Sequence, residues 1–281
     1  MLESGGMGLR TESSSEESRT IYFPEIEGLG TTYEAYVTSR ILDRFVSENG
    51  IRSVCEYPVC TFRVPGAIAI PLAIKGCRVT LATTNESALQ RAEQLCKRYD
   101  VEDRVQFAKL DVDQLESESF DLVFHLSLLP TMERDLAINP YACLREMVRL
   151  SNKYLIVTNH NLHYSIPVDR ILSYATRTQP QFGDVNLVGA SPVKTMLRNL
   201  GATVMKEFFF DIPPWMAIDL SKIFSGIRVY STQHIARSDE RRIERAMLKY
   251  TFIERSSLPS AIKRVLAHHV AIIAEKPSRP P

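Results

Sequence analysis

The stretch Ile51–Gly66 reads I-R-S-V-C-E-Y-P-V-C-T-F-R-V-P-G, and it predicts a short buried strand followed by a loop that meets a helix at Gly66. In α/β proteins the loop after the first strand is where nucleotide-like ligands usually bind. Such loops normally contain two or three glycines, because the backbone must approach the ligand closely. This loop contains only Gly66, together with Pro58, Pro65 and the acidic Glu56. The sequence therefore predicts a ligand-binding position with an unusual loop.

Outward from this stretch, segments with strand-like and helix-like patterns alternate along the chain. Seven segments have the β-branched or apolar composition of strands: 52–56, 78–84, 105–110, 120–126, 153–158, 203–210 and 269–275. Helical patterns lie between and beside them, at 32–49, 67–76, 86–98, 140–150, 168–176, 193–200 and 238–252. This order predicts an α/β fold, with a Rossmann-like, seven-stranded, mostly parallel sheet, helices on both faces and a helical insertion before the last strand.

Three helix ends carry capping signals. Asn85 is predicted to be the N-cap of the helix that starts at residue 86. Gly50 is predicted to end the first helix in a left-handed conformation. Ser191 and Pro192 predict another helix start, with the serine as N-cap and the proline at the first helical position.

Composition divides the chain into five regions. Residues 1–20 are rich in Ser, Gly and Glu and have too few apolar side chains to order themselves, so they are predicted to be a disordered tail. An N-terminal helix is expected in 21–50 and the core of the sheet in 51–211. A helical insertion is expected in 212–265, and a closing strand in 266–276 returns to the core.

The bulk composition excludes several classes of protein. Lys and Arg number 34 and Asp and Glu 33, so the formal net charge of +1 argues against a nucleic-acid-binding protein. The longest apolar runs fall far short of the roughly 18 residues that a membrane-spanning helix needs. The N-terminus lacks the apolar segment of a signal peptide. Five scattered cysteines without a C-x-x-C pair fit a reducing compartment, and the expected location is the cytoplasm.

Several short strings, taken in order, resemble the class I S-adenosylmethionine-dependent methyltransferase superfamily, closest to its type 11 group, over residues 32–276. V-C-E-Y-P stands at the end of the first strand, R-V-T-L-A-T-T-N at the second and L-D-V-D after the third. F-D-L-V-F-H-L-S stands at the fourth strand, and S-P-V-K-T-M-L-R-N-L-G-A-T-V covers the helix before the sixth. The glycine-rich turn of the family is replaced by a divergent cofactor loop.

The resemblance implies S-adenosylmethionine as the cofactor and assigns residues to its parts. Glu56 would act near the amino group, and Gly66 would bring backbone N–H groups toward the carboxylate. Thr84 stands where the family has the Asp or Glu that accepts both ribose hydroxyls, and a threonine can make only a weaker contact. Asp111 would accept from the adenine amino group, and Val112 would offer its backbone N–H.

Two functions remain open at this stage. The first is methyl transfer from S-adenosylmethionine to a small-molecule acceptor, with the catalytic residue unknown and His125 as a weak candidate. The second is a non-catalytic methyltransferase-fold binding or scaffold subunit with a protein partner, which the missing glycines and the pair Thr83-Thr84 favour. Homo-oligomerisation is open in both cases.

Other chemistries have less support. The sequence contains neither G-x-x-x-x-G-K-[ST] nor G-x-G-x-x-G, which argues against P-loop nucleotide hydrolases and Rossmann dehydrogenases. His160 and His163 have H-x-x-H spacing, and His268-His269 follows later in the chain. Because these residues and the cysteines match no structural zinc pattern, no metal site is predicted.

Overall fold

The computed structural model of the chain describes residues 28–59, 65–110, 114–125, 139–162, 189–212 and 259–277, together with positions 167, 174 and 251. The predicted tail and most of the predicted insertion lie outside these residues. The same is true of the predicted helices at 168–176 and 238–252, apart from single positions.

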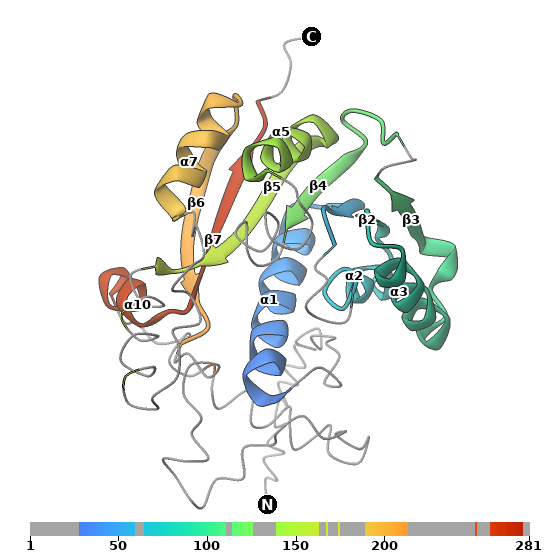
Figure 1. Cartoon of the computed structure of the whole chain (residues 1–281), viewed down its shortest axis with the longest axis horizontal. Helices are drawn as coiled ribbons and strands as arrows, with labels where there is room; N and C mark the ends of the chain where they lie inside the picture. The colour runs from blue at the N-terminus through green and yellow to red at the C-terminus, as the bar shows by residue number, and fades with distance from the viewer. Residues whose placement is uncertain are drawn as a thin grey trace, which may run out of the picture.

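The sheet has seven strands in the order β3-β2-β1-β4-β5-β7-β6 (Figure 1). β7 runs antiparallel to both of its neighbours, and the pairs among β1 to β5 are parallel. This confirms the predicted fold class. The strands are β1 (Ser53–Glu56), β2 (Arg78–Thr83), β3 (Val105–Lys109), β4 (Phe120–His125), β5 (Ser151–His160), β6 (Thr203–Phe210) and β7 (His269–Glu275).

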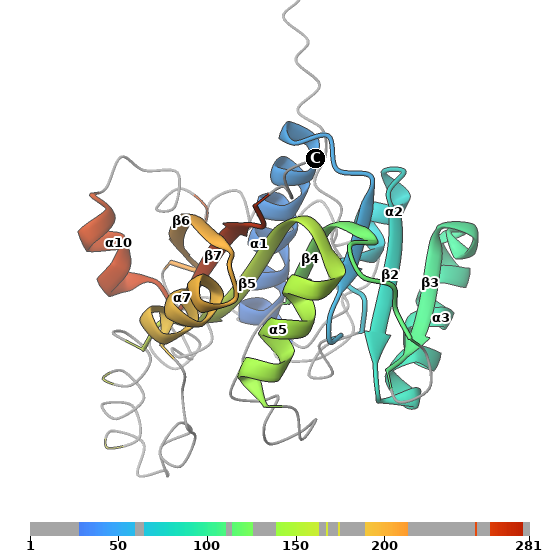
Figure 2. The same cartoon turned by 90° about the horizontal axis from the view of Figure 1, so that it is seen from above.

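Helices cover both faces of the sheet, as Figure 2 shows with the sheet seen from above. The described helices are α1 (Gly28–Glu48), α2 (Ile70–Ile74), α3 (Glu86–Tyr99), the 3₁₀ turn η1 (Glu102–Arg104), α5 (Pro140–Leu150), α7 (Ala190–Asn199) and α10 (Ser260–Leu266). α1, α2 and α3 contribute to one buried apolar cluster, and α5 and α7 contribute to the other. None of the described helices is both long and apolar enough to span a membrane.

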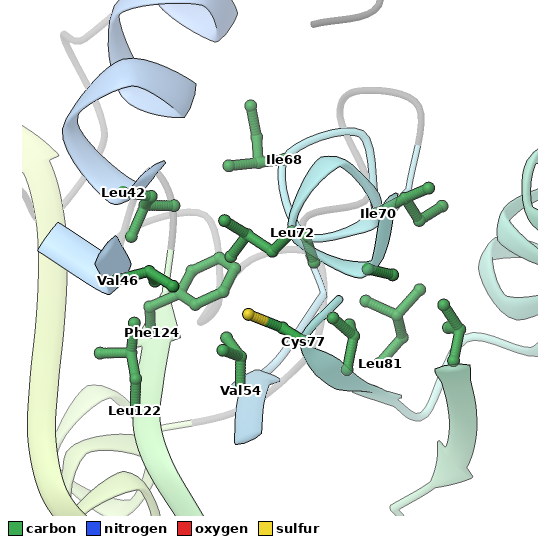
Figure 3. Packing of buried hydrophobic residues seen from close by; sticks show 14 of the residues in the cluster. Leu42, Val46, Val54, Ile68, Ile70, Leu72, Cys77, Leu81, Leu122 and Phe124 are labelled. Atoms are coloured by element: carbon green, nitrogen blue, oxygen red, sulfur yellow. The ribbon is translucent and has the colours of Figure 1, made fainter. Parts of the chain in front are cut away.

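Side chains of the central strands alternate between the two apolar clusters. In β1, Val54 belongs to the cluster under α1 and α2, whereas Cys55 belongs to the one under α5. Figure 3 shows the first cluster, in which Leu42 of α1 and Leu72 of α2 approach Phe124 of β4. Because burying one such side chain is worth about 1.5–3 kcal/mol, this packing fixes α1 and α2 over the centre of the sheet.

Two of the three predicted helix ends are confirmed. The Asn85 side chain accepts a hydrogen bond from the backbone N–H of Ala88 at 3.0 Å, and Gly50 has φ +63°. The prediction for Ser191 is wrong, because α7 starts at Ala190 with Gly189 as its N-cap. Pro192 still lies in the first turn, where backbone N–H groups have no intrahelical partner, so the proline fits there as well.

The segment after Gly66 is less helical than its apolar pattern predicts. Residues 65–69 form turns, and only Ile70–Ile74 are helical, with Pro71 in the first helical turn. Proline has a fixed φ and no N–H, so it suits a helix start better than a helix interior. β5 is longer than predicted at both ends, because Ser151 pairs with Phe120 of β4, and Asn159 and His160 pair with β7.

A half-buried carboxylate joins the amino ends of β1 and β4. Asp121 accepts hydrogen bonds from the backbone N–H groups of Arg52 and Ser53, both at 2.9 Å. Burial alone would raise the pKa of Asp121, but these hydrogen bonds outweigh it and hold the pKa below its usual value. The ionised carboxylate therefore stabilises the central strand pair at the edge opposite to the candidate site.

Candidate functional site

The carboxyl ends of β1, β2 and β4 meet at one edge of the sheet. Glu56 is the last residue of β1 and lies in register with Leu81 of β2 on one side and Phe124 of β4 on the other. The chain leaves β1 toward β2 and later continues on the other side of β1 with β4, so β1 marks the topological switch point. Ligands of open α/β sheets bind in the crevice at this point.

Glu56 places a carboxylate inside this corner. The residue is only 2% exposed. Burial, with a further contribution from the charge of Glu56, raises the pKa of the neighbouring Cys55 thiol well above its ordinary value. A carboxylate in such surroundings requires positive or hydrogen-donating groups nearby. The position therefore suits the ammonium end of an amino-acid-like ligand.

The loop after β1 is attached to both neighbouring strands. The backbone N–H of Tyr57 donates to the carbonyl oxygen of Phe124 at 3.0 Å. The N–H of Val59 donates to the carbonyl oxygen of Ala82 at 2.9 Å, and Val59 is fully buried. The peptide bond between Tyr57 and Pro58 is cis. Two N–H groups that a glycine-rich loop would turn toward a ligand are thus used to hold this loop across the switch point.

His125 also holds the loop. Its ring is 2% exposed, and its Nδ1 lies 3.2 Å from the carbonyl oxygen of Pro58. A carbonyl oxygen can only accept, so this contact requires the proton on Nδ1. His125 therefore positions the first loop over the end of β4, and its catalytic role stays a prediction.

Gly66 packs closely against β2. It has φ +75°, and a Cβ atom at this position would lie 2.7 Å from Cδ1 of Leu81 and 3.0 Å from Cδ1 of Ile70. Both the left-handed conformation and the close approach require glycine. Internal packing accounts for this glycine by itself, so its contact with a cofactor stays a prediction.

The end of β2 presents one exposed threonine. The Thr83 side chain is fully buried, and its hydroxyl oxygen accepts from the backbone N–H of Asn85 at 3.2 Å. Thr84 is exposed beside it. Glu86 lies 3.5 Å from the ammonium group of Lys109, so its carboxylate is directed toward β3. Thr84 is therefore exposed at the corner where the resemblance expects the ribose. Asp111 and Val112 lie outside the described residues.

A second polar cluster lies farther along the same edge of the sheet, and the sequence did not predict it. His269 pairs with His160 of β5 and with Phe210 of β6, so the strand register brings His160 next to His268 and His269. Nδ1 of each of the latter two lies 3.2 Å from Oδ2 of Asp211. Burial alone would raise the pKa of Asp211, but hydrogen bonds from His268 and His269 hold its pKa below the usual value. The sequence signals were His160 and the pair His268-His269, which become neighbours only once β5 and β7 pair. His163, the other histidine of the H-x-x-H spacing, lies outside the described residues.

Comparisons with known proteins support the methyltransferase resemblance. Residues 64–154 match a family model described as "Methyltransferase domain". A search of curated proteins found no matching sequence.

Three solved structures illustrate the likeness of the fold. A geranyl diphosphate methyltransferase, solved in complex with GPP and sinefungin, has a TM-score of 0.53 and 8% identity, and the match covers 88% of this chain and 80% of that one. The [4+2]-cyclase SpnF has a TM-score of 0.52 and 16% identity, and the match covers 88% of this chain and 83% of that one. The magnesium protoporphyrin IX methyltransferase from Synechocystis PCC 6803 with bound SAH has a TM-score of 0.50 and 13% identity, with 89% of this chain and 84% of that one covered.

The resemblance to class I methyltransferases is therefore confirmed, by the family model over residues 64–154 and by the fold over most of the chain. The identities to these structures are too low to carry more than the fold. One of the three is described as a cyclase, which illustrates that the fold alone does not fix the reaction.

Proposed function

We propose that this chain binds S-adenosylmethionine at the corner formed by β1, β2 and β4 and catalyses transfer of its methyl group to a small-molecule acceptor. The observation that carries the proposal is the switch point at β1, where Glu56 and Thr84 lie at the same edge of a methyltransferase-type sheet. The geranyl diphosphate and magnesium protoporphyrin enzymes, both methyltransferases named for small molecules, support this class of acceptor.

Each end of the cofactor has a proposed partner. The buried carboxylate of Glu56 suits the ammonium group, and the exposed hydroxyl of Thr84 suits one ribose hydroxyl. Asp111 and Val112, which follow β3, are proposed for the adenine. When bound, the cofactor supplies a methyl group on a positively charged sulfur. The chain's contribution is to hold that methyl group and the acceptor in line and to exclude water from them.

The fixed first loop contributes to this positioning. Hydrogen bonds from His125, Tyr57 and Val59 attach residues 57–59 to the ends of β4 and β2. The backbone N–H groups of Tyr57 and Val59 are therefore not available to the cofactor carboxylate. We therefore expect weaker binding than a glycine-rich loop would give.

The buried, free cysteines among the described residues support a reducing compartment such as the cytoplasm.

The test is a binding titration with two matched variants. Glu56→Gln removes the buried charge and should weaken binding of S-adenosylmethionine about 10-fold or more, the value of a charge-assisted hydrogen bond of about 1.5–3 kcal/mol. Glu86→Gln removes a neighbouring carboxylate that is 67% exposed and directed toward Lys109, so it should leave the affinity unchanged. Equal affinities for the two variants would mean that Glu56 does not contact the cofactor.

A second candidate function is a non-catalytic binding or scaffold subunit. β6 is an edge strand of the sheet, and its residues Thr203–Glu207 are exposed or half-buried. Edge strands can pair with another chain. A groove of about 570 Å³ lies beside it, lined by residues of α1, β6 and α10 that include Phe45, Phe209 and Lys263. If folded protein binds no cofactor, measuring the molar mass in solution and the effect of Met205→Lys on it would test whether β6 pairs with a second copy.

A further inference from the structure

Five buried polar side chains from four segments gather at the far end of the carboxyl edge, beyond β4 from the cofactor corner. His160 ends β5, Asp211 follows β6, His268 precedes β7, His269 begins it, and Glu34 lies in α1. None is more than 7% exposed. We propose that this cluster binds a divalent transition-metal ion of the zinc type, with His160, His268, His269 and Asp211 as ligands.

The spacing of the ligand atoms suits one ion. Oδ2 of Asp211 lies 3.2 Å from Nδ1 of His268 and 3.2 Å from Nδ1 of His269. One nitrogen from each of the three histidines lies within 4.8 Å of the other two. A tetrahedral zinc site with bonds of about 2.0–2.1 Å separates its ligand atoms by about 3.3 Å. The three histidines therefore lie close enough together to share one ion, and Asp211, which contacts two of them, is placed as the fourth ligand.

Glu34 has the position of a supporting carboxylate. Its Oε1 lies 3.4 Å from Nε2 of His269, the nitrogen opposite to the one that faces Asp211. Histidine ligands commonly donate their second ring N–H to a carboxylate, which fixes the tautomer and the orientation of the ring. His269 would therefore bind the metal through Nδ1 and donate to Glu34 through Nε2.

The backbone around Asp211 is held in an uncommon conformation. Asp211 has φ +63°, which a non-glycine residue rarely adopts, and its carbonyl oxygen accepts from the N–H of His268 at 3.2 Å. Its Oδ1 accepts no hydrogen bond from the described residues. A fully buried carboxylate in a strained turn, with one oxygen open to a further partner, is the arrangement a metal ligand needs.

The burial of the cluster indicates a structural ion rather than a catalytic one. Catalytic zinc keeps an open position for water or substrate, whereas structural zinc is closed. The side chains of this cluster are buried. The proposed ligands come from β5, the turn after β6 and the start of β7. The ion would join the antiparallel end of the sheet to β5 and to α1.

The experiment measures metal in the purified full-length chain. After chelator treatment and dialysis against zinc, the chain should hold about one zinc per molecule, measured by plasma mass spectrometry. Asp211→Asn should lower zinc affinity at least 10–100-fold, the effect typical even of supporting residues. His125→Gln alters a buried histidine outside the cluster and should retain full zinc content. Zinc binding that is absent, or unchanged in Asp211→Asn, would overturn the proposal and leave a network of ion pairs.

A measurement on the unaltered chain avoids the risk that a variant misfolds. Cobalt bound to the metal-free chain should give the visible absorption of a tetrahedral nitrogen and oxygen site, without a thiolate charge-transfer band. Zinc should also raise the midpoint of thermal unfolding, because it binds only the folded arrangement. A thiolate band, or the spectrum of hydrated cobalt with no shift in the midpoint, would contradict the assignment of these ligands.

Discussion

Replacing Gly66 with alanine should destabilise the chain by about 2–5 kcal/mol, from two causes. A side chain at φ +75° costs about 1–2 kcal/mol, because Cβ approaches the following carbonyl. The new methyl group would also lie 2.7 Å from Cδ1 of Leu81 and 3.0 Å from Cδ1 of Ile70, two fully buried side chains. Overpacking of this kind costs about 1–3 kcal/mol.

Gly50→Ala is the matched control. Gly50 also has a left-handed φ, +63°, but no atom lies within 4 Å of a Cβ built there. It should carry the conformational cost alone, and the gain from a less flexible unfolded chain is the same for both variants. Urea unfolding followed by circular dichroism should therefore place Gly66→Ala about 1–3 kcal/mol below Gly50→Ala.

A double variant tests the steric contact itself. Leu81→Ala removes the atom that the new methyl group would strike, so combining it with Gly66→Ala should cost less than the sum of the two single changes. If Gly66→Ala and Gly50→Ala prove equally stable, or if the double variant is strictly additive, the close packing of Gly66 on β2 is refuted. A loss of cofactor affinity without loss of stability would assign this glycine to the ligand instead.

Three further predictions concern stability and reactivity. Asp121→Asn should cost about 1–3 kcal/mol at neutral pH, because the ionised carboxylate accepts from the N–H groups of Arg52 and Ser53. The pKa of Asp121 is lower in the folded state. Its contribution to stability is therefore present above the pKa of the unfolded state and is lost as the pH falls through the folded-state pKa. The urea midpoints of the unaltered chain and of Asp121→Asn should converge in acid. Asn85→Ala should lower the free energy of unfolding by about 1 kcal/mol in the same assay. A decrease of less than a few tenths of a kcal/mol would mean that the hydrogen bond from the Ala88 N–H to the Asn85 side chain does not form. Burial raises the pKa of all four described cysteine thiols, so at least four of the five thiols should react with a disulfide reagent only after denaturation; rapid reaction of all five in the native state would contradict this burial.

The sequence predicted the sheet well because its signals are local. The strands are rich in apolar or β-branched residues, and the ranges 203–210 and 269–275 coincide with β6 and β7. The helix at 140–150 also coincides with α5. Errors arose where the local pattern is ambiguous. The apolar run after Gly66 contains only a five-residue helix, because a proline within it can occupy only the first turn.

The candidate site could be predicted only in part, because its contacts join segments far apart in the sequence. Glu56 could be placed at the end of β1 from its position after an apolar strand. The contact between His125 and the carbonyl of Pro58 depends on the pairing of β1 with β4, 67 residues apart in the chain. The histidine cluster depends on the register of β5, β6 and β7, which no local pattern specifies.

The central claim is that the corner at Glu56 and Thr84 binds S-adenosylmethionine. Isothermal titration of the full-length chain with S-adenosylmethionine, and then with S-adenosylhomocysteine, tests it most directly. We expect each compound to bind at one site per chain and each to displace the other, with an affinity that Glu56→Gln weakens about 10-fold or more. Folded protein that binds neither compound at millimolar concentration would contradict the claim and leave the non-catalytic function as the account of this fold.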